Sequence, residues 1–89
     1  MILRMSKKSK LLDKLANFQS DANWTMDELV LVLTWHGFVQ TGGRGSHCVF
    51  TRPGYPAAVN LVSHGSKMKT GYVREVRSHI ESLKQQTEN

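Results

Sequence analysis

The sequence predicts a small α+β domain whose elements follow the order α-α-β-β-β-α. Apolar residues recur at helical spacing in the first third of the chain and again near its C-terminal end, whereas the middle holds short runs rich in valine, threonine and phenylalanine. The length of 89 residues suits one domain rather than two. We therefore expect two layers, with the helices packed on one face of an antiparallel sheet and the other face open.

Two helices are expected before the sheet. In residues 10–18 the apolar side chains lie at roughly helical spacing, and Ser9 is available as an N-cap. Thr25 and Glu28 then form a capping box, in which each side chain accepts a hydrogen bond from the other residue's backbone. This motif predicts a second helix from about Met26 to His36.

The middle of the chain is expected to form a three-stranded antiparallel sheet. Residues 38–41 and 46–52 flank a glycine-rich turn, a pattern typical of a hairpin. The segment 53–56 contains two prolines and a glycine and predicts another turn. Residues 58–62 beyond it predict a third short strand.

A last amphipathic helix is expected to cover the sheet, with Thr70 as its N-cap and a polar tail from Gln85 that frays. Apolar residues form one stripe along this helix: Val73, Val76, Ile80 and Leu83.

Positive charge is concentrated in the middle of the chain. The formal net charge is +5, and no carboxylate stands between Glu28 and Glu75. That stretch carries the following cations: Arg44, Arg52, Lys67, Lys69 and Arg74. Clustered positive charge attracts phosphates and makes binding salt-dependent. The pattern indicates a site for a polyanion, and the alternative is a soluble basic domain whose charges have no specific partner.

The best candidate for chemistry is His47, which follows the basic turn Gly42-Gly43-Arg44-Gly45-Ser46. Side chains alternate along a strand, so a core-facing Phe50 turns Cys48 inward and His47 toward the open face. A neutral imidazole, with a pKa near ~6.5, can accept or give a proton near neutral pH. The arrangement suits cleavage of RNA by its own 2′-hydroxyl, and the alternative is an ordinary surface histidine.

Further residues are expected around this histidine. Arg44 from the turn, and Lys67 and Lys69 from the loop before the last helix, would lie within reach of it and stabilise charge on a phosphate. His64 is a second candidate for proton transfer or phosphate contact.

Other chemistries are disfavoured. A site for hard cations needs converging carboxylates, which the middle of the chain lacks, and the histidines show no tight spacing for zinc. Cys48 is expected to point inward, where a thiol is usually inert. His36 and His79 lie on expected helices and are interpreted as structural or exposed. We therefore expect no metal and no other cofactor.

The chain is expected to be cytoplasmic. Its single cysteine excludes an internal disulfide and fits a reducing compartment. No apolar run reaches the length of a signal peptide or a membrane-spanning helix, so we expect no association with a membrane.

From about Trp24 to Leu83 the chain resembles the HicA toxin family, also called the YcfA-like family, of toxin-antitoxin modules. In their order and spacing, the motifs that carry the resemblance are fairly specific. They are Gly37-Phe38, Gly45-Ser46-His47 with Phe50 following, and His64-Gly65-Ser66-Lys67 with Gly71 before the last helix.

The resemblance implies a double-stranded-RNA-binding-domain-like fold and a type II toxin: a metal-independent endoribonuclease that cleaves mRNA and blocks translation. It implies that His47 is the catalytic histidine. It divides the chain into an N-terminal extension with a short helix (1–22), a HicA-like ribonuclease domain (23–86) and a tail (87–89). The implied partners are RNA and an acidic-faced HicB-type antitoxin that covers the active site.

In this interpretation the glycine-rich turn approaches the RNA backbone while cations hold and guide its phosphates. The RNA-binding residues are expected to be Gly43, Arg44, Gly45, Ser46, Arg52, His64, Lys67 and Lys69. Two positions depart from the family pattern: Cys48 stands where many members have a second histidine, and Ser63 where a proline is common. The alternatives are a non-catalytic double-stranded-RNA-binding module and a degenerate toxin that acts only through its antitoxin.

Overall fold

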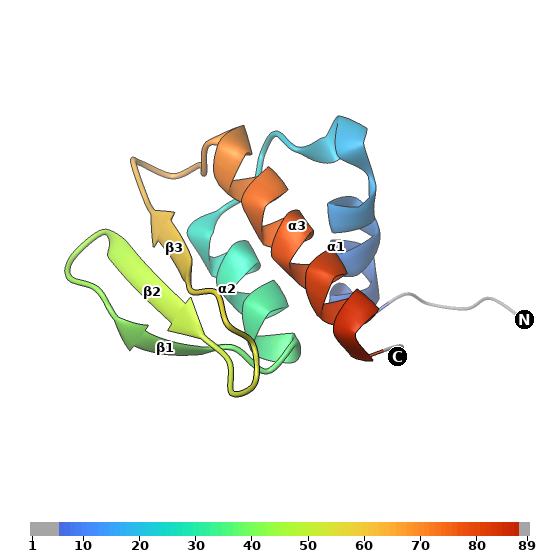
Figure 1. The fold of residues 1–89 in the computed structure, drawn as a ribbon. Coiled ribbons are helices and arrows are strands. Elements are labelled where there is room, and N and C mark those ends of the chain that lie inside the picture. The colour runs from blue at the N-terminus through green and yellow to red at the C-terminus, as the bar shows by residue number, and fades with distance from the viewer. Residues whose placement is uncertain (1–5, 88–89) are drawn as a thin grey trace, which may run out of the picture.

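The computed structural model of the chain describes residues 6–87, and it confirms an α+β fold with the expected order of elements. The three strands form one antiparallel sheet in the order β1-β2-β3 (Figure 1). The elements are α1 (Lys7–Ala16), the 3-10 turn η1 (Phe18–Ser20), α2 (Met26–Trp35), β1 (Val39–Gly42), β2 (His47–Thr51), β3 (Val59–Val62) and α3 (Thr70–Thr87).

The helices form two layers rather than the single layer that was expected. Helices α2 and α3 lie against one face of the sheet, and α1 packs on these two helices on the side away from the sheet (Figure 1). The first helix therefore joins the body of the protein through other helices, and the opposite sheet face stays open.

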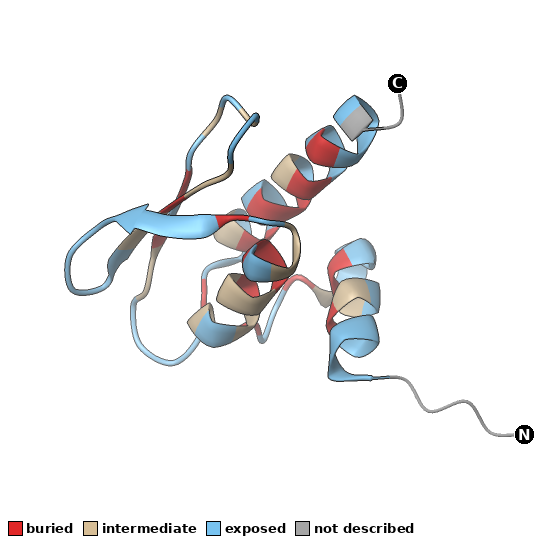
Figure 2. Cartoon of the chain, turned by 90° about the horizontal axis from the view of Figure 1, so that it is seen from below, coloured by how far each residue is buried: buried red, intermediate tan, exposed pale blue. Residues whose placement is uncertain are grey.

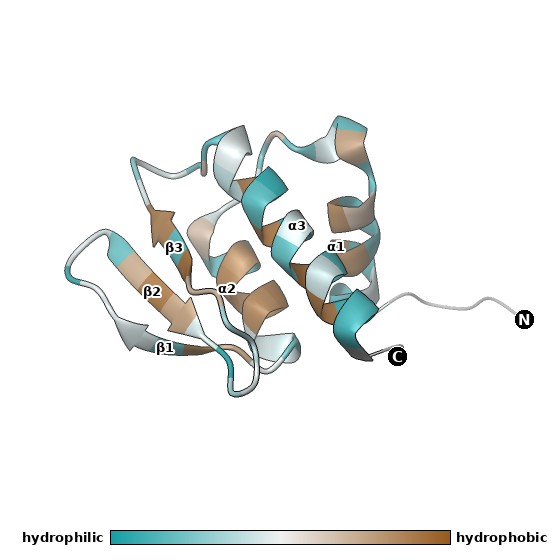
Figure 3. Ribbon diagram, in the orientation of Figure 1, coloured by the Kyte–Doolittle hydropathy of each residue, from teal (hydrophilic) through white to brown (hydrophobic). Residues whose placement is uncertain are grey.

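The hydrophobic core lies between the sheet and the helices. Figure 2 shows the buried residues on the inner sides of these elements, and Figure 3 shows hydrophobic residues along α2 and on β2 and β3. The sheet contributes Phe50, Val59 and Leu61, all of them buried. Leu11 and Leu15 of α1 belong to the same cluster, so the first helix shares one core with the rest of the chain.

The first helix was predicted three residues too late. It begins at Lys7, because the Ser6 hydroxyl accepts a hydrogen bond from the backbone N–H of Ser9 (3.1 Å) and so acts as the N-cap in place of Ser9. It ends at Ala16, because the Asn17 side chain accepts from the N–H of Gln19 (3.0 Å) and starts η1 instead.

The second helix begins where the sequence predicted. The Thr25 hydroxyl accepts from the Glu28 N–H (3.2 Å), and the Glu28 carboxylate accepts from the Thr25 N–H (2.9 Å), which confirms the capping box. His36 is the C-cap residue, just beyond the helix.

The last helix is longer than expected. It begins at Thr70 itself and remains helical to Thr87, so the prediction that the chain frays from Gln85 is wrong as far as the described residues extend. Leu83 is buried in the core near the end of α3. This anchor holds the last turns in place, and each further residue adds a backbone hydrogen bond to a helix that already exists.

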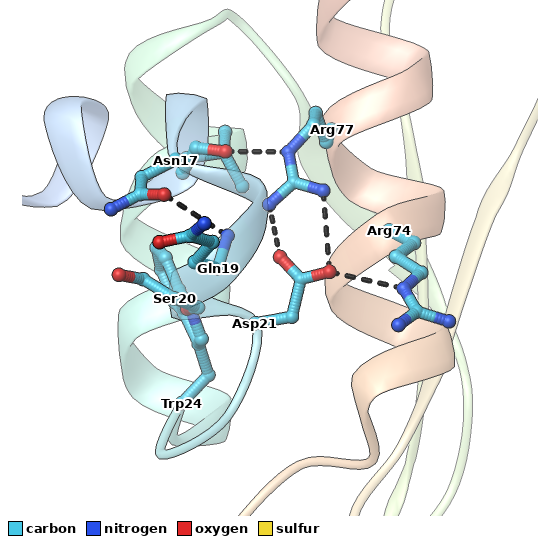
Figure 4. Close-up of polar contacts among 8 residues, drawn as sticks. Asn17, Gln19, Ser20, Asp21, Trp24, Arg74 and Arg77 are labelled. Carbon is cyan, nitrogen blue, oxygen red and sulfur yellow. Dashed lines mark hydrogen bonds and ion pairs between the residues drawn. The ribbon is translucent and has the colours of Figure 1, made fainter.

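A buried ion pair, which the sequence did not predict, joins the N-terminal segment to α3 (Figure 4). Asp21 and Arg77 are each only 5% exposed, and the guanidinium of Arg77 donates to both carboxylate oxygens and to the carbonyl of Leu15. Arg74 adds a hydrogen bond from Nε to Oδ2 of Asp21 (3.0 Å). The contacts tie the end of α1, the segment after η1 and the middle of α3 to one another.

The ion pair makes stability depend on pH. Hydrogen bonds from Arg77 lower the pKa of Asp21 below its ordinary 3.8, although burial opposes them. The unfolded chain therefore takes up the proton at higher pH than the folded protein does. The contribution of Asp21 is complete above about pH 5 and is lost as the pH falls through 3.8 toward the folded pKa.

We expect urea denaturation in this acid range to show a steeper loss of unfolding free energy in the wild type than in Asp21→Asn. The variant has no carboxyl group to protonate at this position. Equal slopes in the two proteins would show that the pair does not control the acid response.

Candidate nucleic-acid interface

The turn before β2 folds back onto the first residue of that strand. The N–H of His47 donates to the carbonyl of Arg44 (2.9 Å). Gly43 has a φ of 106°, and a Cβ at this position would lie 2.2 Å from the carbonyl oxygen of His47. Gly43 is therefore required because the protein's own backbone approaches it closely. This contact explains the glycine without any contact to RNA.

Substitution of Gly43 is expected to disturb the histidine more than substitution of Gly45. Gly45 also has a positive φ, of 59°, but a Cβ there has no neighbour within 4 Å. We expect Gly45→Ala to lower the free energy of unfolding by about 1 kcal/mol. Gly43→Ala should lower it by about 2 kcal/mol or more, because the backbone at His47 must also shift. Urea denaturation of both variants measures the difference, and equal losses would contradict the assigned role of Gly43.

His47 lies on the open face of the sheet, as the alternation predicted. It pairs with Val62 on β3, whereas Phe50 pairs with Val59 in the core. The histidine is exposed, and Cys48 is half-buried opposite Leu61 on the inner face.

The end of β3 brings the second histidine to the same end of the sheet as the first residue of β2. The N–H of Ser63 donates to the carbonyl of Ser46 (3.0 Å), so the residues directly before His47 and His64 are hydrogen-bonded to each other. His64 is exposed in the loop that follows. The structure therefore gathers the glycine-rich turn, His47 and the start of the β3–α3 loop.

The two lysines of the β3–α3 loop differ in how they are held. Nζ of Lys67 donates to the Asn23 side chain (2.7 Å), and the next N–H, of Met68, donates to the carbonyl of Trp24 (2.7 Å). Lys69 is exposed at the start of α3, where it lines an open pocket with Glu75. Among residues 6–87, no hydrogen bond or ion pair joins the ring of His47 to Arg44 or to either lysine.

Arg52 lies at the far end of β2. It follows the last residue of the strand, about 16 Å from His47 at the usual rise per residue. Its side chain runs across Gly37 at the end of α2, where a Cβ on the glycine would lie 2.8 Å from Nε. Arg52 therefore packs on the backbone after α2, at the opposite end of β2 from the two histidines.

His36 and His79 both have structural hydrogen bonds, as expected, although His36 lies just beyond its helix as the C-cap. Nδ1 of His36 bonds to the carbonyl of Val32 (2.7 Å). Nδ1 of His79 bonds to the hydroxyl of Tyr55 (2.8 Å), which joins α3 to the β2–β3 loop.

Sequence reasoning missed Asn23 and Asp21, the residues that fix Lys67 and Arg74. Asn23 has a positive φ of 65°. Asparagine in a polar stretch is a known signal for such a backbone. No comparable local signal exists for Asp21, because its partners lie 53 and 56 positions away.

In the described part of the chain, no group of three or more His, Cys, Asp or Glu side chains gathers in a way that could hold a metal ion. None of the helices within residues 6–87 combines the length and apolar character needed to cross a membrane.

Comparisons with known proteins gave no match: no family model, no curated protein and no solved structure is significantly similar to this chain. A proposal for its function therefore rests on its own residues, their geometry and the resemblance that its motifs carry.

Proposed function

We propose that the protein is a metal-independent endoribonuclease that cleaves mRNA, the toxin of a type II toxin-antitoxin pair of the HicA kind. The observation that carries the proposal is the position of His47, exposed on the open sheet face directly after a turn that bears Arg44. Three helices and an antiparallel three-stranded sheet are compatible with the double-stranded-RNA-binding-domain-like fold that the resemblance implies.

The proposed reaction uses the substrate's own hydroxyl as nucleophile. The neutral imidazole of His47 takes the proton of a ribose 2′-hydroxyl, and the 2′-oxygen attacks the adjacent phosphorus. The bond from phosphorus to the 5′-oxygen breaks, and that oxygen takes a proton from water or from a protonated His64. Arg44 stabilises the negative charge that develops on the phosphate oxygens. The products are a 2′,3′-cyclic phosphate and a 5′-hydroxyl.

The partner proposed for this surface is an acidic-faced antitoxin of the HicB kind. Residues 29–74 contain no Asp or Glu, so the surface around His47 presents little repulsion to an acidic protein or to RNA. The two ligands would compete for one surface. Such a toxin acts in the cytoplasm, where mRNA is translated.

Induced expression in a bacterial host tests the proposal. We expect growth arrest and loss of transcripts with the wild type, and neither with His47→Ala. Asn60→Ala is the matched control, because Asn60 is an exposed residue of β3 on the same open face. Arrest that persists unchanged in His47→Ala would remove this histidine from the mechanism.

A second candidate is a non-catalytic module that binds double-stranded RNA through its shape. One observation favours it: among the described residues, no hydrogen bond orients the imidazole of His47. A general base normally has such support. Purified protein that binds duplex RNA and leaves single-stranded transcripts intact in the presence of a chelator would favour this candidate over the nuclease.

A further inference from the structure

A pocket of about 340 Å³ lies between η1 and α3, where Phe18 and Asp21 of the N-terminal extension face residues of the last helix. It is lined by the exposed side chain of Phe18 and by the buried pair of Asp21 and Arg77. Arg74, Ser78 and Glu81 complete it from α3. The N-terminal segment thus builds a cavity against the last helix that the rest of the chain does not form alone.

Phe18 is unusual for an aromatic residue of a small domain. It is 69% exposed, the most exposed large hydrophobic side chain of the described residues. The guanidinium of Arg77 lies 4.5 Å from the ring centroid and covers part of the ring. The exposure leaves much of the ring accessible, and an exposed aromatic face is a platform on which an unpaired base can stack.

Arg74 presents a fixed cation at the edge of the same pocket. Its Nε donates to Asp21, which restrains the guanidinium, while the side chain remains 68% exposed. Figure 4 shows its two terminal amino groups without a contact to the residues drawn. A planar fork of this kind suits a phosphate. Glu81 in the pocket repels a phosphate, so the pocket favours a base inside and a phosphate at Arg74.

The pocket is connected to His47 by a continuous series of backbone and side-chain contacts. Ser63 bonds to Ser46 beside the histidine, and the β3–α3 loop then reaches Asn23 through Lys67. Asn23 lies two residues after Asp21, which lines the pocket. In Figure 1 the β1–β2 turn, the β3–α3 loop, the start of α3 and η1 follow one another along one end of the molecule.

We propose that single-stranded RNA runs along this end of the molecule from His47 to Phe18, where one unpaired base stacks on the exposed ring and its phosphate binds Arg74. The cations along the route are Arg44, Lys67, Lys69 and Arg74. The inference rests on the proposed nuclease function, which supplies its substrate. It gives the N-terminal segment the role of binding the RNA at a point distant from the bond that is cut.

Binding of an uncleavable RNA analogue tests this inference separately from cleavage. The probe is a fluorescein-labelled, single-stranded 2′-O-methyl oligonucleotide of about twelve nucleotides, followed by anisotropy with the full chain. We expect Phe18→Ala to weaken binding about tenfold, and Phe18→Tyr, which keeps the π-face, to restore it. Gln19→Ala is the matched control, because Gln19 is exposed on the same turn and should bind as the wild type does. The melting temperature of each variant verifies the fold.

Inorganic polyphosphate, which has charge but no bases, separates the two contacts. Phe18→Ala should leave the affinity for polyphosphate unchanged. Arg74→Ala should lower the affinity for both ligands and reduce the salt dependence of both affinities. Oligonucleotide binding within twofold of wild type in Phe18→Ala, or an equal loss for polyphosphate, would overturn the inference.

The result also separates the inference from the proposed function. Phe18-dependent binding by a protein that cuts no RNA would overturn the nuclease and support the route. RNA cleavage by a protein whose oligonucleotide binding does not depend on Phe18 would support the nuclease and overturn the route. A wild-type protein that fails to bind the oligonucleotide would overturn the route, and the cleavage of a transcript would still decide the nuclease.

Discussion

Asp21→Ala is expected to lower the free energy of unfolding by about 3 kcal/mol, a large share of the stability of a small domain. The substitution leaves the guanidinium of Arg77 buried, and among the described residues the carbonyl of Leu15 is its one remaining hydrogen-bond acceptor. A buried charge without its counter-ion is strongly destabilising. In a chain of this size, the loss corresponds to a fall in melting temperature of about 15 °C.

Thermal and urea denaturation at neutral pH measure this effect, with Asp13→Ala as the control. Asp13 is an exposed aspartate on α1 whose removal should change the free energy of unfolding by less than about 0.5 kcal/mol. Similar losses in the two variants would mean that the buried pair contributes nothing beyond an ordinary surface charge.

His47→Ala is expected to reduce the rate of RNA cleavage by about 100-fold or more, the usual contribution of a general base. The side chain is exposed on the open face, opposite to the face that carries the core residue Phe50, so the fold and its stability should be preserved. Single-turnover cleavage of a labelled transcript in chelator measures the rate, and circular dichroism checks the fold.

Two comparisons sharpen this prediction. Asn60→Ala, on the same open face, should cleave at the wild-type rate. His64→Ala should cleave more slowly if His64 protonates the leaving oxygen, and at the wild-type rate if water does. A His47→Ala protein that cleaves as fast as the wild type would exclude the histidine as the general base.

Local sequence signals predicted the elements that local interactions determine. The capping box at Thr25 and Glu28 involves residues three positions apart, and the helix begins where that motif predicted. The side chains of β2 likewise alternate between the two faces of the sheet. Because Phe50 faces the core, His47 faces outward, as expected. The start of α1 was missed because Ser6 and Ser9 are equally good caps by sequence, and the observed helix uses the earlier serine.

The details of the candidate interface depend on contacts between distant segments, which periodicity does not reveal. Lys67 bonds to Asn23, 44 positions earlier. Arg74 was counted with the polyanion-binding charge, and the structure shows its Nε fixed by Asp21 while its side chain stays exposed. Arg52 packs across Gly37 at the other end of β2. The sequence therefore showed correctly that the middle segment is basic, but only some of its cations lie near His47.

The chemistry of the RNA ends tests the central proposal most directly. Purified wild-type protein is incubated with a labelled single-stranded transcript in excess chelator, and the ends of the products are identified. The proposed mechanism predicts 2′,3′-cyclic phosphate and 5′-hydroxyl ends, formed without added metal and greatly reduced in His47→Ala. Intact RNA, cleavage that appears only when a divalent metal is added, or 5′-phosphate ends would contradict it.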